Sequence, residues 1–334
     1  HPTGRAVAVK RRSWLPQSTA LTWVGLVLVG AYVLIATIGR LHGDPTALVA
    51  DGAIAPSWAH PFGTDALGRD LLARTAEGAW TSMVISVTAV ALSCAVAVPV
   101  GLVAALRAGR WTDALVMRII ETTQVVPPFI LVLLLLGLTG SRPMEVGPVT
   151  VSINVRIAVC LAIGFVPFFA RVTRSAALAE LQEPYVDELR RIGVGTRELI
   201  AGEVLPNVVP TLAVQALLAL AIVVFAEGGL SFLGLGVPPP APTLGNLIAE
   251  AGSQLLGDSW WYALVPGLVL VAGITGLNLL SDAVADHLLG QGPLPPEPAS
   301  LTTSTSPTTT EAEPAEAATP AALPTASTAA RTAP

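Results

Sequence analysis

The sequence predicts an all-α polytopic membrane protein with six transmembrane helices. Of its 334 residues, 52% are hydrophobic and 12% are charged, whereas about a quarter of the residues in a soluble domain are charged. Six apolar segments approach the roughly 20 residues that a helix needs to cross the hydrocarbon core of a bilayer. They lie within a transmembrane domain at 19–290, at about 19–39, 81–106, 113–138, 149–170, 208–234 and 261–281.

The basic residues predict which side of the membrane each loop faces. Short cytoplasmic loops are rich in Lys and Arg, and twelve of the 18 such residues fall on one side of the six spans. These are Arg5, Lys10, Arg11, Arg12, Arg107, Arg110, Arg118, Arg171, Arg174, Arg190, Arg191 and Arg197. We therefore expect both termini in the cytoplasm, with residues 1–18 as a cytoplasmic N-terminal segment. No small-residue cleavage site follows the first span, so we expect no cleavable signal peptide.

The composition changes abruptly after Gly290. Residues 291–334 are rich in Pro, Thr and Ala and contain no aromatic residue. Such a segment cannot bury enough apolar surface to offset the entropy lost on ordering. We expect a disordered cytoplasmic tail.

A polar, charged segment at 180–207 separates two long apolar segments. Pro184 suits the first turn of a helix, because a proline lacks the N–H that has no partner there. The next apolar residues recur at helical spacing, at Tyr185, Leu189 and Ile192. Gly193 can adopt the positive φ of a helix C-cap, Thr196 can cap a second short helix, and Pro206 limits that helix. This pattern fits a solvated loop and a docking element equally well.

Between the first two spans, residues 60–80 predict an amphipathic helix on the outer side. Thr64 or Asp65 can cap it. Its apolar face would hold Leu67, Leu71 and Leu72, and its polar residues are Arg69, Asp70, Arg74 and Glu77. Such a helix would lie on the membrane surface or at the mouth of a pathway, or would simply orient the next span. His60 alone makes no metal site.

The end of the fifth span carries an acidic residue and a helix break. Glu227 lies where an unpaired carboxylate would be costly in hydrocarbon, so we expect it to face the bundle interior, an aqueous cavity or the interface. Three prolines at 238–240 end the helix, and residues 243–254 can form a short amphipathic helix. An outer gate or a simple plug would fit this segment.

Residue usage excludes several kinds of catalytic site. With the single lysine Lys10, the chain cannot contain a phosphate loop of the form G-x-x-x-x-G-K-[ST]. Cys94 and Cys160 lie in apolar runs without a Cys or His at metal-ligand spacing. We expect no catalytic residue, metal site or cofactor in this chain, and no nucleic-acid partner. Work against a gradient would draw its energy from other chains.

Several stretches, in chain order, carry a family resemblance. They are HPFGTDALGRD at 60–70, PYV through Gly193 to LPN at 184–207, LSFLGLGVPPP at 230–240, GN at 245–246 and NLLSD at 278–282. Together they resemble the inner-membrane permease subunits of binding-protein-dependent ABC importers, specifically the C-type subunit of dipeptide, oligopeptide and nickel systems. The resemblance covers roughly residues 15–290.

This resemblance implies a type I ABC importer permease fold in a bacterial inner membrane. The chain would form half of the translocation pathway for di- or oligopeptides. Its implied partners are a homologous second permease subunit, two cytoplasmic ATPase subunits that bind ATP and Mg, an external solute-binding protein and the lipid bilayer. The loop at 171–207 would contain coupling helices, and the 180–207 part would sit in a cleft of an ATPase subunit.

The resemblance also implies roles for particular residues. The ATPase-coupling residues would be Tyr185, Val186, Asp187, Glu188, Leu189, Gly193, Leu205 and Pro206. Residues for gating or docking at the outer face would be Gly63, Thr64, Asp65, Gly68, Arg69 and Asp70. Candidates for the pathway are Glu227, Ser231 and Asn246.

Two positions depart from the family pattern. The Glu-Ala-Ala core of the coupling loop reads Asp187-Glu188-Leu189, and the basic or His position before the closing Leu-Pro is Glu203. Either the loop grips a standard ATPase less tightly, or the groove of the partner has changed to match.

Other functions remain open from the residues. The same architecture could carry a nickel chelate, haem or another small solute. An ion-gradient-driven secondary transporter would predict paired intramembrane carboxylates or interrupted half-helices near the midplane. A membrane-embedded enzyme would predict a nucleophile with a base, or a metal site.

Overall fold

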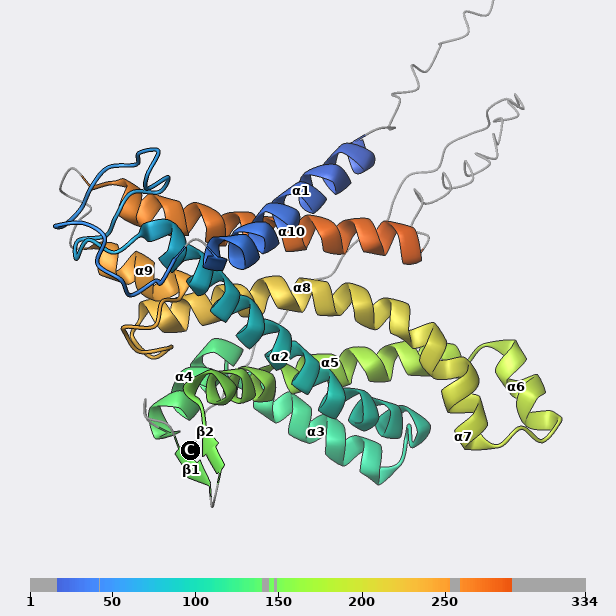
Figure 1. Cartoon of the computed structure of the whole chain (residues 1–334). Helices are drawn as coiled ribbons and strands as arrows, with labels where there is room; N and C mark the ends of the chain where they lie inside the picture. Colours follow the sequence, from blue (N-terminus) through green and yellow to red (C-terminus); the bar gives the residue numbers. More distant parts are fainter. Residues whose placement is uncertain (1–16, 42, 140–143, 147–148, 253–258, 290–334) are drawn as a thin grey trace, which may run out of the picture. The chain divides into compact units, whose positions relative to one another are not determined.

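The computed structural model describes residues 17–41, 43–139, 144–146, 149–252 and 259–289. Nearly all of the expected N-terminal segment, and the whole tail at 291–334, lie outside the described residues. Within the unit of residues 1–292, the chain is mostly helical (Figure 1). The elements are α1 Gln17–Ile38, η1 Gly39–Leu41, α2 Leu71–Leu106, α3 Trp111–Val125, α4 Pro128–Thr139, β1 Met144–Val146, β2 Val149–Val151, α5 Ile153–Leu181, α6 Pro184–Arg191, α7 Thr196–Leu199, η2 Ile200–Val204, α8 Leu205–Phe232, α9 Leu244–Ala251 and α10 Trp261–Leu288.

Among the described residues, five helical stretches are long and apolar enough to cross a membrane. They are Ala20–Leu41, Leu71–Leu106, Ile153–Leu181, Thr196–Phe232 and Trp261–Leu288. The third expected span, at 113–138, is not one straight helix, because α3 and α4 meet at an angle of 83°. Pro127 and Pro128 explain why the helix is broken at this point. A proline lacks the N–H of the helical ladder and disfavours helical geometry in the residue before it.

The segment before the second span also differs from the prediction. No separate amphipathic helix covers 60–80, because α2 starts at Leu71 and runs unbroken for 36 residues. Its N-cap is Asp70, whose carboxylate accepts the backbone N–H of Ala73, and not Thr64 or Asp65. The helix cannot start earlier, since Gly68 has a φ of 81°, outside the right-handed helical region.

The fourth span begins later and ends later than expected. An antiparallel hairpin of the three-residue strands β1 and β2 pairs Met144 with Val151, a small addition to the helical fold that the sequence predicted. The helix α5 then starts after Ser152, whose side chain accepts the N–H of Val155. It continues through residue 181, so the loop expected at 171–207 begins inside a helix. Beyond residue 170, α5 still packs apolar side chains such as Val172, Ala177 and Leu181 in a buried cluster, and this packing extends the helix past the apolar run.

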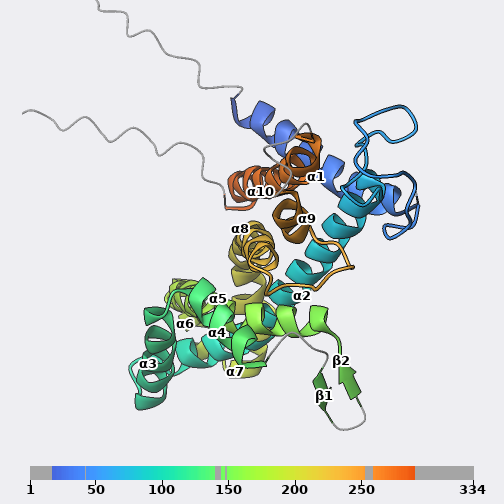
Figure 2. The ribbon, with the colours of Figure 1, turned by 90° about the vertical axis from the view of Figure 1, so that its left-hand side faces the viewer.

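The helices pack in two groups around α2 and α8. One large buried cluster joins α2, α3, α4, α5 and α8, with Ile85, Phe169 and Leu230 among its fully buried members. On another side, α1 and α10 lie side by side (Figure 1 and Figure 2). The short helix α9 begins where the sequence predicted, with Thr243 and Asn246 forming a reciprocal capping box.

Candidate functional site

Residues 180–207, called the α6 segment below, join the long helices α5 and α8. The short helix α6 has Pro184 in its first turn, as predicted. It ends before Gly193, whose φ of 91° is the positive value expected there. A Cβ at this glycine would meet no atom within 4 Å. The turn therefore lies in open space.

The second half of the α6 segment differs from the prediction. Gly195 holds the N-cap position of α7 in an extended conformation, so Thr196 is already helical and does not act as the cap. Pro206 does not end this helix either, because α7 continues through η2, a π-helical turn, into α8. Pro206 lies in the first turn of α8, where a missing N–H is tolerated.

One buried side chain anchors α6 to the membrane helices. Val186 is fully buried. It packs in a cluster that includes Ala105, Ala177, Leu199, Val204, Val208 and Leu212. These residues belong to α2, α5, α7, η2 and α8, so α6 is attached to several helices at once. Burying a valine side chain stabilises such an attachment by about 1.5–3 kcal/mol.

A polar cluster adds a second attachment. The Tyr185 hydroxyl donates a hydrogen bond to the Glu180 carboxylate. The Asn207 amide donates to the same carboxylate oxygen at 2.7 Å and to the Tyr185 oxygen at 3.2 Å. The bond to Glu180 raises the pKa of the Tyr185 hydroxyl above its usual value, so the tyrosine remains a donor. This cluster ties the end of α5, the start of α6 and the start of α8 together.

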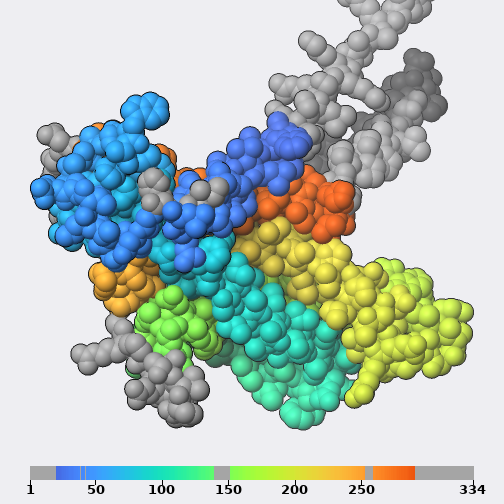
Figure 3. All heavy atoms as spheres, viewed as in Figure 1, coloured from blue at the N-terminus to red at the C-terminus, as the bar shows by residue number. Residues whose placement is uncertain are grey.

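Most of the rest of α6 is open to solvent, and the segment lies at the molecular surface (Figure 3). Its exposed residues are Tyr185, Asp187, Glu188, Arg190, Arg191, Ile192 and Gly193, while Leu189 and, beyond α6, Leu205 are half-buried. Asp187 and Arg190 pair at 3.4 Å with side chains 69% and 48% exposed, so the pair adds little stability. The coupling residues predicted from the sequence therefore lie together, and most remain free to meet a partner.

The residues predicted for the outer face form a buried network. The Asp65 carboxylate accepts hydrogen bonds from Arg69 Nε at 2.7 Å and from Arg74 Nη1 at 2.6 Å. It also accepts the backbone N–H groups of Leu67 and Arg69. Both Asp65 and Arg74 are fully buried. Their charges are neutralised inside the chain.

This network reaches across to α9 and α10. Arg74 Nη1 lies 2.9 Å from Glu250 Oε2 on α9, and Arg69 Nη2 lies 3.4 Å from the same oxygen. The Tyr262 hydroxyl on α10 donates to Glu250 at 2.9 Å. We call Asp65, Arg69, Arg74, Glu250 and Tyr262 the loop clamp. It holds the 60–70 loop, α2, α9 and α10 together.

The other outer-face residues shape the same loop. The Thr64 hydroxyl accepts the Ile54 N–H at 2.7 Å and donates to the Gly52 carbonyl at 2.8 Å. Gly68 is required, since a Cβ there would lie 1.8 Å from the Ala50 carbonyl oxygen. Gly63 likewise has a positive φ, and Asp70 caps α2 and lies 2.7 Å from His60 Nδ1.

The three pathway candidates are buried, and two of them, Glu227 and Ser231, are joined by a hydrogen bond. Ser82 Oγ on α2 donates to Glu227 at 2.5 Å, and Ser231 Oγ donates to it at 2.7 Å. Glu227 therefore faces the bundle interior, one of the three environments expected for it. The hydrogen bonds of Asn246 go instead to the backbone of residues 237, 241 and 243. Their role in a pathway stays a prediction.

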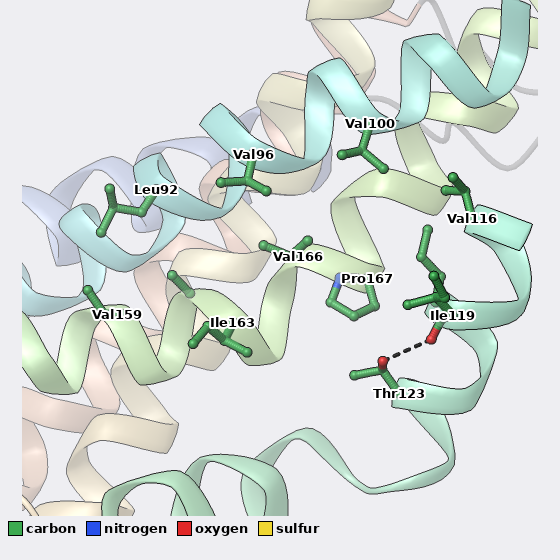
Figure 4. A pocket seen from close by; sticks show the side chains of 12 residues that line it. Leu92, Val96, Val100, Val116, Ile119, Thr123, Val159, Ile163, Val166 and Pro167 are labelled. Atoms are coloured by element: carbon green, nitrogen blue, oxygen red, sulfur yellow. Dashed lines mark hydrogen bonds between the residues drawn. The ribbon is translucent and has the colours of Figure 1, made fainter. Parts of the chain in front are cut away.

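Two cavities lie on opposite faces of α5. The first has a volume of about 550 Å³ and lies between α2, α3 and α5 (Figure 4). Its lining is apolar except for Thr123, whose hydroxyl donates to the Ile119 carbonyl at 2.8 Å. The second, called the aromatic cavity below, has about 580 Å³ and lies between α3, α4, α5 and α8. Its lining includes Phe129, Phe165, Phe168, Phe225, Gln124 and Arg171.

Sequence reasoning missed several of these residues. Arg74 and Glu250 were visible only as charges on amphipathic helices, and their pairing across 176 residues depends on tertiary structure. Arg171 was counted only as a basic residue of an inner loop. The one sequence signal for Arg74 was its position beside a membrane-length apolar run, where an exposed charge would be costly.

Comparison with known proteins agrees with this architecture. A family described as "Binding-protein-dependent transport system inner membrane component" matches residues 97–289. A putative peptide permease protein of Brucella suis is 37% identical over 233 residues, which cover 70% of this chain and 73% of the relative. The di/tripeptide transport system permease protein DppC of Pseudomonas aeruginosa is 33% identical over 252 residues, covering 73% of this chain and 79% of that protein.

A solved structure shares the fold. An inward-facing structure of the MetNI methionine ABC transporter superposes with a TM-score of 0.50 and 18% sequence identity, covering 65% of this chain and 96% of that chain. This similarity supports the type I importer permease fold expected from the sequence. The family match extends over more than half of the chain. This chain therefore belongs to the family of inner membrane components of binding-protein-dependent transport systems.

Proposed function

We propose that this chain is the permease subunit of an ATP-driven importer of peptides that an external solute-binding protein delivers. Its family supports a transport subunit of the inner membrane, and several relatives are named as peptide permeases. The observation that carries the proposal is α6. A short helix with an exposed, charged surface is held between two membrane-length helices by the buried Val186 and by the polar cluster around Tyr185.

Such an importer needs partners for each step. A homologous permease completes the pathway, and two cytoplasmic ATPase subunits bind ATP and Mg. Both termini and α6 lie in the cytoplasm, and the loop clamp lies on the outer side of the bacterial plasma membrane. A short helix seated in a groove is a common recognition mode, so the exposed surface of α6 fits a cleft of the ATPase.

The contacts of α6 suggest how the ATP-driven closure of the ATPase subunits is transmitted to the membrane helices. Val186 and Tyr185 tie α6 to α5 and α8, so a displacement of α6 is passed to both helices. Packed elements respond to such displacements by rigid-body shifts. On the outer side, the loop clamp keeps α2, α9 and α10 together and lets them move as a unit. This gives the outer residues a role in gating without direct contact to a binding protein.

The test begins with purification from native membranes. We expect ATP-hydrolysing subunits to co-purify with this chain, and peptide uptake by reconstituted vesicles to require ATP. The break between α3 and α4 is a feature that ion-driven transporters also use. Uptake driven by an ion gradient, with no ATPase in the preparation, would therefore overturn the proposal in favour of that class.

Charge reversal tests the role of α6 itself. The double variant Asp187→Lys and Glu188→Lys changes two exposed side chains and should fold normally. We expect it to lose most ATP-driven uptake while the membrane protein remains intact. The matched control is Glu121→Lys, which changes an exposed acid on α3. Unchanged uptake by the double variant would count against coupling through α6.

A further inference from the structure

We propose that the aromatic cavity binds a short peptide during its passage, with an apolar side chain against the phenylalanine rings and the carboxylate on Arg171. The inference rests on the proposed function, because it concerns the cargo of the same importer. It adds a binding site within this chain. It also names the preferred cargo of that site, a hydrophobic peptide with a free carboxylate.

The walls of the cavity suit an apolar group. Four of the seven phenylalanines in the chain line it: Phe129, Phe165, Phe168 and Phe225. Its volume of about 580 Å³ falls within the roughly 300–1,000 Å³ of small-molecule sites, which are mostly apolar with a few polar groups. Aromatic rings also favour other rings through edge and offset contacts. An aromatic or large aliphatic side chain is the best match.

One end of the cavity carries a positive charge that has no acidic partner among the described residues. Arg171 Nη1 donates to Gln124 Oε1 at 2.9 Å, and no carboxylate of the described residues forms an ion pair with it. Arg174, one turn further along α5, differs because it holds Asp113 through two bonds of 2.7 Å. Arginine binds carboxylates strongly through paired N–H groups. Arg171 is therefore available for the carboxylate of a peptide.

The position of Arg171 fits the edge of the membrane. It lies 18 residues after the start of α5, about 27 Å at 1.5 Å per residue, close to the roughly 30 Å thickness of the hydrocarbon core. The charge can therefore remain solvated while the phenylalanine rings extend into the bilayer. An amphipathic ligand matches this arrangement.

The broken span argues against a lipid tail as the occupant. Gln124 and Pro128 flank the break between α3 and α4, where backbone groups leave the helical ladder. Backbone groups freed at such a break need protein or water as partners, and at the membrane edge beside Arg171 water can reach them. The first cavity in Figure 4 lacks both the break and the charged end. It suits hydrocarbon alone.

The test uses the complete transporter in liposomes with its own binding protein, so that selection before delivery is constant. The variant Phe225→Ala removes a ring that is 64% exposed, and Phe232→Ala is its control, 52% exposed on the same helix. We expect Phe225→Ala to lower ATP-dependent uptake of diphenylalanine relative to dialanine by about tenfold. Phe232→Ala should leave this ratio unchanged.

The charged end is tested separately. Arg171→Gln should lower uptake of diphenylalanine by about tenfold, as expected for loss of a charge-assisted bond. Uptake of diphenylalanine amide, which lacks the carboxylate, should change little. Arg171→Lys should restore part of the preference, and Arg118→Gln, an exposed arginine on α3, should have no effect.

The outcomes separate this inference from the proposed function. If the wild-type transporter imports both peptides and all ratios stay unchanged in Phe225→Ala and Arg171→Gln, the cavity assignment is wrong and the importer stands. A phospholipid that the wild type retains and Arg171→Gln loses, with unchanged peptide ratios, would also overturn it. Absence of any peptide uptake by the wild type would overturn the proposed function itself.

Discussion

The loop clamp and the α6 segment are both charged motifs between apolar segments, yet the structure treats them in opposite ways. In the loop clamp, Asp65 and Arg74 are fully buried and neutralise each other. In the α6 segment, Asp187 and Arg190 form one long, exposed pair. A charged motif can thus stabilise its own chain or remain available to a partner. Burial, and not composition, separates the two cases.

The loss of stability should differ most between these two regions when one carboxylate charge is removed from each. Asp65→Asn would leave Arg69 and Arg74 without their carboxylate, and breaking a buried ion pair costs about 3–5 kcal/mol. The matched change Asp187→Asn should alter stability by less than about 0.5 kcal/mol, since the site is exposed. Thermal unfolding of the purified proteins in detergent measures both. Equal midpoints for the two variants would contradict the comparison.

Two glycines provide the second test. Both Gly68 and Gly193 have a positive φ, and placing alanine in that conformation costs about 1–2 kcal/mol. At Gly68 the new Cβ would also strike the Ala50 carbonyl, whereas at Gly193 it meets open space. We expect Gly68→Ala to lower the unfolding midpoint clearly more than Gly193→Ala. If Gly193→Ala is the more damaging change, the loop at 60–70 is less tightly built than described.

Removing the anchor of α6, Val186, should cause an intermediate loss of stability. Val186→Ala removes buried methyl groups, and at roughly 0.8 kcal/mol per methylene the loss is about 1.5–2 kcal/mol. Val209→Ala on α8 is the control, because Val209 is 49% exposed. Limited proteolysis within 180–207 should become faster in Val186→Ala alone. A resistant α6 segment in that variant would mean that other contacts hold it.

The polar cluster of Tyr185, Glu180 and Asn207, beside the anchor Val186, should contribute least to stability. Tyr185→Phe deletes one hydroxyl and should destabilise by about 0.5–1.5 kcal/mol, the usual net value of a hydrogen bond. Because Asn207 bonds to the same Glu180 oxygen, Asn207→Ala and Tyr185→Phe should not be additive when combined. Unfolding midpoints of the two single variants and the double variant give the coupling. Strict additivity would show that the cluster does not act as one unit.

Local signals predicted much of the fold. Apolar length located the spans, Pro184 and Gly193 bounded α6, and Thr243 began α9, because each depends on backbone preferences of a few residues. The prediction failed where neighbours in space decide. The 83° break of the third span, the start of α2 at Leu71 and the continuous course of α7 into α8 all depend on how the chain packs.

The sequence by itself determined that this chain crosses a membrane, lacks a phosphate loop and carries the motifs of an importer permease, because apolar length and residue identity are local properties. Only the tertiary structure decided which charges are hidden. Arg74 meets Glu250 and Tyr262 from distant helices, while Arg171 meets no acid among the described residues. An ion pair needs two groups within a few ångströms, and that distance is set by packing.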